Sequence, residues 1–109
     1  MKELTLKEVC EKYNISRRAV QGYESNGLVS PTGKTDRGYL LYDENAQKQI
    51  AAIKRCQSFG LTLKEIKILF ESSKYEVKEI LEEKLEELIE EKKELSKTIN
   101  ELKSLIKKL

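Results

Sequence analysis

Apolar residues recur at helical spacing in two short stretches near the start of the chain, each bounded by capping residues. In the first stretch, Thr5 and Glu8 form a capping box, which predicts a helix that ends near Tyr13–Asn14. In the second stretch, Ser16 is the predicted N-cap and Gly27 the left-handed stop. Two short helices joined by so tight a turn predict a helix-turn-helix. Its shared apolar residues are Leu6, Val9, Cys10, Ile15, Ala19 and Val20.

A β-prone pattern follows the two helices. The apolar run at 28–31, the polar loop at 32–38 with its glycines and the apolar run at 39–42 predict a small hairpin, or wing. Because a two-stranded hairpin is only marginally stable alone, we expect its apolar side chains to pack on the helices.

The pattern then returns to helical spacing. Asp43 is the predicted N-cap of a third helix, which Gly60 ends, and Thr62 begins a fourth helix that fades at 72–73. The spacing assigns inward-facing residues to both helices: Ala46, Ile50, Ile53 and Cys56 in the third, and Leu63, Ile66, Leu69 and Phe70 in the fourth.

The last part of the chain has a different period. Ser73 and Glu76 form another capping box, and no glycine or proline follows as far as Leu109, so we predict one helix of about 35 residues and roughly 50 Å. Its apolar residues follow a seven-residue repeat with one polar interruption. A stripe this long would be exposed on a monomer, and we expect a second copy of the chain to cover it. The predicted dimerisation seam consists of Leu81, Leu85, Leu88, Lys92, Leu95, Ile99, Leu102, Ile106 and Leu109.

The two paired helices can run antiparallel or parallel. An antiparallel register that sets Leu81 opposite Ile106 fills every layer of the seam except the layer of Lys92, and it brings Glu82 near Lys103. A parallel pairing is also compatible with the repeat. Lys92 either specifies the register or extends out of the seam, with its stem covering apolar surface. The predicted fold class is thus mainly α: a winged helix-turn-helix domain over residues 1–72, followed by a dimerisation helix over 73–109 that forms an antiparallel coiled coil.

Composition limits the chemistry of the chain. Residues 1–72 carry 12 Lys and Arg against 9 Asp and Glu, so DNA affinity would depend on the placement of these cations and on two copies acting together. The chain has no His, and Cys10 and Cys56 lack metal-ligand spacing, so we expect buried free thiols and no metal or cofactor. We find no signal peptide and no apolar run long enough to cross a bilayer, which favours a cytoplasmic protein without membrane contact.

Three groups of residues are candidate DNA contacts. Arg17 and Arg18 lie in the first turn of a helix, where the dipole disfavours cations, which favours an external anion such as a phosphate or a guanine edge; a solvated surface pair is the alternative. Lys34 and Arg37 on the wing suit phosphate contact, or they keep the loop soluble. The helix start at Thr62 and Lys64 is a second phosphate site or simply a well-capped helix.

Three short segments match the motifs of a known family. Gln-Gly-Tyr-Glu at 21–24 and Gly-Leu-Val-Ser-Pro at 27–31 stand where the family often has Arg-Tyr-Tyr-Glu/Asp and Gly-Leu-Ile/Val-x-Pro, and Gly-Tyr-Leu-Leu-Tyr at 38–42 stands where it has Gly-Tyr-Arg-x-Tyr. With this order of parts, the chain resembles the MerR family of bacterial transcription regulators over essentially its whole length. The resemblance implies further DNA contacts at Tyr23, Tyr39 and Tyr42, and helical spacing places Gln21, another candidate contact, on the same face as Arg17 and Arg18.

The chain departs from the family pattern at four places. Gln21, Gly22 and Leu40 replace Arg, Tyr and Arg, and each loses a usual DNA-facing group. Gly22 is the oddest, because glycine inside a helix costs about 0.5–1 kcal/mol. Family members usually continue past the long helix, whereas this sequence stops at Leu109, so we expect a short member that lacks a C-terminal effector domain.

The expected function is a homodimeric, sequence-specific transcription regulator. The resemblance implies a dimer on a pseudo-palindromic promoter site in double-stranded DNA, which distorts the DNA and admits RNA polymerase. The alternative is a coiled-coil adaptor or antiregulator with weakened DNA reading. An enzyme is not expected, because no nucleophile with a base and no glycine-rich phosphate cradle is found. We expect Phe59, Phe70 and Tyr75 to be core residues, the alternative being a ligand groove at the dimer junction.

Overall fold

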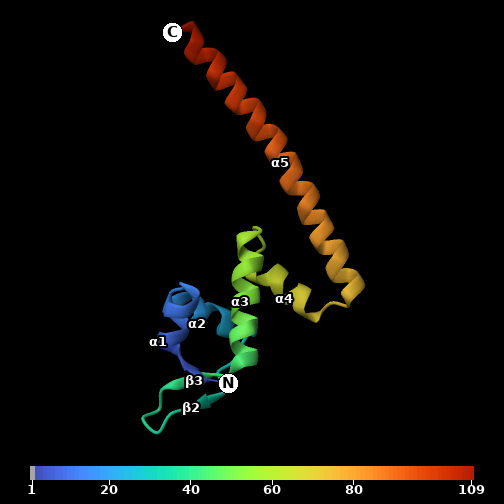
Figure 1. Ribbon diagram of the computed structural model, residues 1–109. Coiled ribbons are helices and arrows are strands. Elements are labelled where there is room, and N and C mark those ends of the chain that lie inside the picture. Colours follow the sequence, from blue (N-terminus) through green and yellow to red (C-terminus); the bar gives the residue numbers. More distant parts are fainter. Residues whose placement is uncertain (1) are drawn as a thin grey trace. The chain divides into compact units, whose positions relative to one another are not determined.

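The computed structural model describes residues 2–109, which form two compact units that divide between Glu71 and Ser72 (Figure 1). The structure confirms the predicted fold class of a mainly helical, winged helix-turn-helix chain with a long C-terminal helix. Its elements are β1 (Leu4–Thr5), α1 (Leu6–Tyr13), α2 (Arg17–Ser25), β2 (Gly33–Lys34), β3 (Leu40–Tyr42), α3 (Glu44–Ser58), α4 (Leu63–Glu71) and α5 (Lys74–Lys108).

Side-chain caps define where the first two helices begin. The Thr5 hydroxyl accepts a hydrogen bond from the Glu8 amide at 3.3 Å, and the Glu8 carboxylate accepts one from the Thr5 amide at 3.0 Å. These bonds satisfy amides that the helix leaves unpaired and lower the pKa of Glu8. The Ser16 hydroxyl accepts from the Ala19 amide at 3.0 Å and begins α2 in the same way. The caps predicted from the sequence are therefore confirmed.

Helix α2 ends in a Schellman motif. The Leu28 amide donates to the Tyr23 carbonyl and the Gly27 amide to the Glu24 carbonyl, both at 3.0 Å. Gly27 has φ of +73°, a left-handed conformation that glycine adopts without steric cost, which confirms it as the stop signal. The chain then turns away from α2 towards the wing.

The wing belongs to a three-stranded antiparallel sheet with the strand order β1-β3-β2. Leu4 pairs with Tyr42 across β1 and β3, and Gly33 pairs with Leu41 across β2 and β3. The expectation that the first strand of the hairpin lies at 28–31 is wrong, because Leu28 and Val29 are buried outside any strand. The sequence pattern does not predict strand β1, because Leu4 and Thr5 match the residues that precede and cap a helix.

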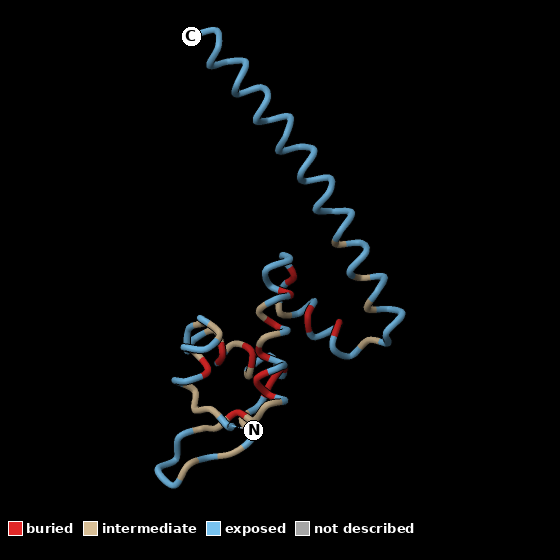
Figure 2. Tube along the Cα trace, in the orientation of Figure 1, coloured by how far each residue is buried: buried red, intermediate tan, exposed pale blue. Residues whose placement is uncertain are grey.

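The hydrophobic core lies in the first unit, where Figure 2 shows the buried residues concentrated. All four inward-facing residues predicted for α3 are buried, and so are Ile66 and Leu69 of α4. The expected burial of three aromatic residues is wrong: Phe59 and Phe70 are each 41% exposed and Tyr75 is 73% exposed. Both cysteines are free, but only Cys56 is buried, whereas Cys10 is half-buried.

A buried amide ties the sheet to the helices. Gln47 of α3 donates through Nε2 to the carbonyls of Lys2 and Tyr42, at 3.1 and 2.9 Å, and accepts through Oε1 from Lys12 Nζ at 3.1 Å. Because every polar group of this buried side chain is used, Gln47 fixes α1, the segment before β1 and the end of β3 against α3.

The second unit is the single long helix α5. Ser73 and Glu76 form the predicted capping box, with the Ser73 amide donating to the Glu76 carboxylate at 3.1 Å, and the helix continues for 35 residues. The side chains of the predicted dimerisation seam are exposed along it, as Figure 2 shows for nearly the whole helix. Such an apolar stripe is typical of a helix that packs against another helix.

Candidate DNA-binding surface

Helix α2 presents a polar face to solvent and an apolar face to the core. Arg17, Arg18, Gln21 and Ser25 are exposed, whereas Val20 on the opposite side is fully buried. The exposed residues follow the spacing of one helix face and begin at the N-terminal end of the helix. A helix-turn-helix uses this end of its second helix to contact base edges in the major groove.

The tip of the wing is a compact turn with exposed cations. The Gly38 amide donates to the Thr35 carbonyl at 2.9 Å, and the Tyr39 amide donates to the Thr35 hydroxyl at 3.1 Å. Gly38 has φ of +85°, so the turn needs glycine there. Lys34 and Arg37 are exposed on this turn, and the Tyr39 side chain is 61% exposed.

The start of helix α4 lies close to α2. A Cβ atom added to Gly22 would lie 4.0 Å from Leu63 Cδ1, at the first residue of α4. Thr62 and Lys64 are exposed beside it. The Thr62 hydroxyl accepts from the Glu65 amide at 3.2 Å, so part of this helix terminus is already satisfied within the chain.

Two tyrosines expected at the DNA surface lie inside the protein instead. Tyr23 is 2% exposed and its hydroxyl donates to Gln57 Oε1 at 2.7 Å; Tyr42 is 0% exposed and its hydroxyl donates to the Glu24 carboxylate. Burial raises the pKa of both phenols, and the Glu24 carboxylate raises that of Tyr42 further. Contact with DNA does not fit this geometry, because neither ring reaches the surface, and both residues instead hold α2 in place.

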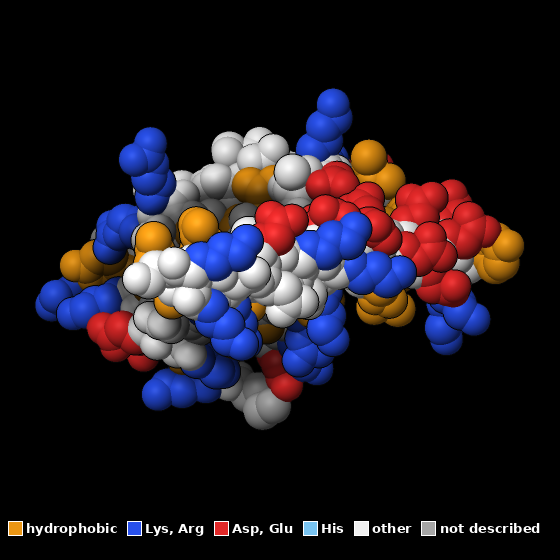
Figure 3. All heavy atoms as spheres, turned by 90° about the horizontal axis from the view of Figure 1, so that it is seen from above, with side chains coloured by type: hydrophobic (Ala, Val, Ile, Leu, Met, Phe, Trp, Pro, Cys, Tyr) orange, Lys and Arg blue, Asp and Glu red, His pale blue; other side chains and the backbone are white. Residues whose placement is uncertain are grey.

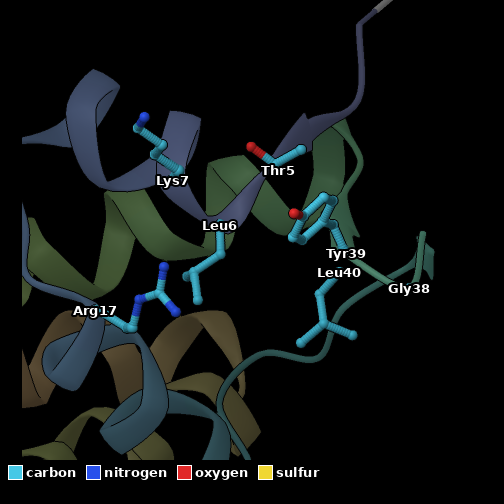
Figure 4. Close-up of a pocket in the computed structure, with 7 residues that line it drawn as sticks. All are labelled: Thr5, Leu6, Lys7, Arg17, Gly38, Tyr39 and Leu40. Carbon is cyan, nitrogen blue, oxygen red and sulfur yellow. The ribbon is translucent and has the colours of Figure 1, made fainter. Parts of the chain in front are cut away.

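A groove of about 450 Å³ lies between the start of α2 and the wing (Figure 4). Leu6 and Lys7 of α1, Arg17 of α2, and Tyr39 and Leu40 of the wing region line it, together with Thr5 and Gly38. The tertiary structure thus brings Arg17 and Tyr39, which are distant in sequence, to one surface feature.

Sequence reasoning missed two exposed residues of this surface. Ser25 lies four residues after Gln21 on the outer face of α2, and the helical period alone could have identified it. Lys7 lines the groove, but only the folded structure brings α1 next to the wing, so no local signal could have found it.

The described residues 2–109 show neither a metal site nor a membrane span. No group of three or more His, Cys, Asp and Glu side chains in this part of the chain is placed to hold a metal ion. None of the helices described there is long and apolar enough to cross a membrane.

Comparisons with known proteins identify the family of this chain. The family model described as "MerR HTH family regulatory protein" matches residues 4–73, and the model described as "MerR, DNA binding" matches residues 47–105. The chain is 32% identical over 59 residues to the mercuric resistance operon regulatory protein of Bacillus cereus, which covers 54% of this chain and 45% of that protein. It is 29% identical over 77 residues to the transcriptional activator mta of Bacillus subtilis, which covers 71% of this chain and 30% of that protein. The chain therefore spans less than half the length of either relative.

Solved structures share the fold. A MerR family transcriptional regulator from Bacillus cereus superposes with a TM-score of 0.80 at 21% identity, over 98% of this chain and 82% of that chain. MtaN, the N-terminus of the Bacillus subtilis multidrug transporter activator, gives 0.77 at 25% identity, over 94% and 97%. HiNmlR, a MerR family regulator lacking the sensor domain and bound to promoter DNA, gives 0.73 at 18% identity, over 96% and 88%. Because the family model covers most of the chain, this protein belongs to the MerR family of helix-turn-helix regulatory proteins.

Proposed function

We propose that this chain regulates transcription by binding a pseudo-palindromic site in double-stranded DNA as an antiparallel homodimer. The observation that carries the proposal is the pairing of two features in one chain. The first unit exposes a cationic helix face beside a cationic wing, and the second unit exposes an apolar stripe that a second copy can cover.

In this proposal the exposed residues divide between two tasks. Arg18 and Gln21 on α2 enter the major groove, where arginine can bind guanine and glutamine can bind adenine, while Arg17, which lines the surface groove beside the wing, contacts the phosphate backbone. The wing and the start of α4 contact the phosphate backbone and fix the orientation of α2. The proposed backbone contacts are Lys34, Arg37, Tyr39, Thr62 and Lys64.

The charges of α5 favour the antiparallel pairing over the parallel one. Residues 76–94 carry nine Glu and four Lys, whereas residues 95–109 carry four Lys and one Glu. Figure 3 shows acidic side chains gathered on the right, where Figure 1 places the N-terminal half of α5. Antiparallel helices set each acidic half against a basic half, whereas parallel helices set the two acidic halves side by side.

The fold shared with HiNmlR, which was solved on promoter DNA, supports a promoter as the target. In the proposed mechanism, the dimer bends or untwists the DNA between its two half-sites and so changes how RNA polymerase engages the promoter. Such a distortion uses the deformability of the DNA in addition to base contacts.

Selection from a random pool of double-stranded DNA, followed by affinity measurements at several salt concentrations, tests the proposal. We expect enrichment of an inverted repeat and affinity that falls steeply with salt, because phosphate contacts release counterions. Sedimentation of the pure protein should show a dimer. A monomer that enriches no DNA sequence would refute the proposal and favour the adaptor alternative.

A further inference from the structure

The groove between α1, α2 and the wing has an unusual combination of surfaces. Leu6, Leu40 and the Tyr39 ring supply apolar area, and Lys7 and Arg17 supply two cations (Figure 4). Three separate segments of the chain contribute these side chains. No carboxylate is among the lining residues that the structure describes, and the nearby Glu8 carboxylate accepts a hydrogen bond from the Thr5 amide.

This combination matches one unit of a DNA backbone. A nucleotide's sugar presents an apolar edge of C–H groups, and the phosphate beside it carries a full negative charge. The apolar side chains of the groove can bury the sugar edge, and the two cations can bind the phosphate as charge-assisted hydrogen bonds.

The position of the groove also indicates that its ligand is the DNA backbone. It lies between the first turn of α2 and the wing, and Arg17 and Tyr39 belong both to the groove and to the proposed DNA surface. A DNA strand that runs from the base edges read by α2 to the wing passes over this groove. A phosphate at this point compensates two cations that have no ion-pair partner among the ion pairs found in residues 2–109.

We propose that the groove holds one sugar and phosphate of the DNA backbone, with Lys7 and Arg17 on the phosphate and Leu6, Tyr39 and Leu40 against the sugar. Lys7 thereby becomes a DNA-positioning residue outside the helix-turn-helix recognition face. This inference rests on the proposed DNA binding and adds a specific contact to it.

The charge of Lys7 is tested by the salt dependence of DNA affinity for the wild type, Lys7→Gln and Lys7→Arg. Each phosphate contact contributes about 0.9 to the slope of log affinity against log salt. We expect Lys7→Gln to reduce the magnitude of the slope by about 1.8, because each protomer of the dimer loses one contact, and Lys7→Arg to retain the slope. Lys48→Gln is the matched control, since Lys48 is an exposed lysine on α3 that pairs with Glu44 and does not line the groove.

The apolar part is tested at Tyr39. We expect Tyr39→Ala to weaken DNA binding at every salt concentration without changing the slope, and Tyr39→Phe to keep wild-type affinity. An unchanged slope for Lys7→Gln, a change no larger than that of Lys48→Gln, or an equal loss in Tyr39→Phe and Tyr39→Ala would overturn the inference. A wild-type protein that binds no DNA at low salt would instead overturn the proposed function itself.

Discussion

The glycine in the middle of α2 offers a sharp test of how this helix is stabilised. A Cβ atom added to Gly22 meets only Leu63 Cδ1 at 4.0 Å, which is ordinary van der Waals contact, and the Gly22 backbone is not left-handed. Alanine therefore fits at this position without displacing any neighbour. Gly27 provides the contrast, because it has φ of +73° and a Cβ there would lie 3.4 Å from Lys67 Nζ.

Alanine substitutions at Gly22 and Gly27 should shift the free energy of unfolding in opposite directions. Gly22→Ala removes the entropic penalty of a helical glycine and should increase the free energy of unfolding by about 0.5–1 kcal/mol. Gly27→Ala forces an L-residue into the left-handed region and should decrease it by about 1–2 kcal/mol. For a unit of this size, about 1 kcal/mol corresponds to a Tm shift of roughly 4–8 °C. We expect Gly22→Ala to melt several degrees higher than the wild type and Gly27→Ala several degrees lower.

The measurement should report on the first unit alone. Helix α5 dominates the far-UV circular dichroism, so the near-UV signal of the buried Tyr23 and Tyr42 is the appropriate probe of thermal unfolding. If Gly22→Ala melts below the wild type, or both variants shift in the same direction, the reasoning is refuted. A stabilised Gly22→Ala that loses DNA affinity would show that the DNA approaches the α2 backbone closely at this position.

Three further predictions concern the DNA contacts, the dimer and the buried phenols. Arg18→Ala should relax the preference for one base by roughly 1–3 kcal/mol, measured by competitive binding to single-base variants of the selected site. An equal loss of affinity for all DNA sequences would instead assign Arg18 to a phosphate contact. Leu88→Asp places a charge in the proposed seam and should convert the dimer to a monomer in sedimentation. DNA affinity should then be lost, whereas the near-UV signal of the first unit should not change. The control Ser104→Asp lies outside the seam and should leave the dimer intact. Folding raises the pKa of Tyr42, so the stability that this phenol contributes is fully present below its unfolded pKa of about 10 and is lost as pH rises above it. Above that pH the Tm of the wild type should fall more steeply than that of Tyr42→Phe, and parallel curves would contradict this assignment.

Local chemistry explains which elements the sequence predicts well. The hydroxyls of Thr5, Ser16 and Ser73 and the carboxylate of Asp43 each accept a hydrogen bond from the amide three residues ahead, so neighbours in sequence decide these helix starts. The stops at Gly27 and Gly60 likewise depend only on their own positive φ. Such signals are complete within a few residues and need no tertiary partner.

Pairings across long sequence separations explain what the sequence does not predict. The two-residue strand β1 exists because Leu4 pairs with Tyr42, which no local pattern encodes. The burial of Tyr23 and Tyr42 depends on Gln57 and Glu24, which lie 34 and 18 residues away. In the candidate site, Arg17 and the wing cations were identifiable from their types and positions, whereas the groove with Lys7 required the folded arrangement of three segments.

Tyr42 braces the wing against the helix-turn-helix. It is the last residue of β3, its carbonyl accepts from Gln47 of α3, and its hydroxyl donates to Glu24 of α2. Through these contacts Tyr42 holds the base of the wing at a fixed distance from α2. We expect this fixed spacing to favour DNA in which the distance from a major-groove edge to the neighbouring backbone already fits, including at base pairs that no side chain touches.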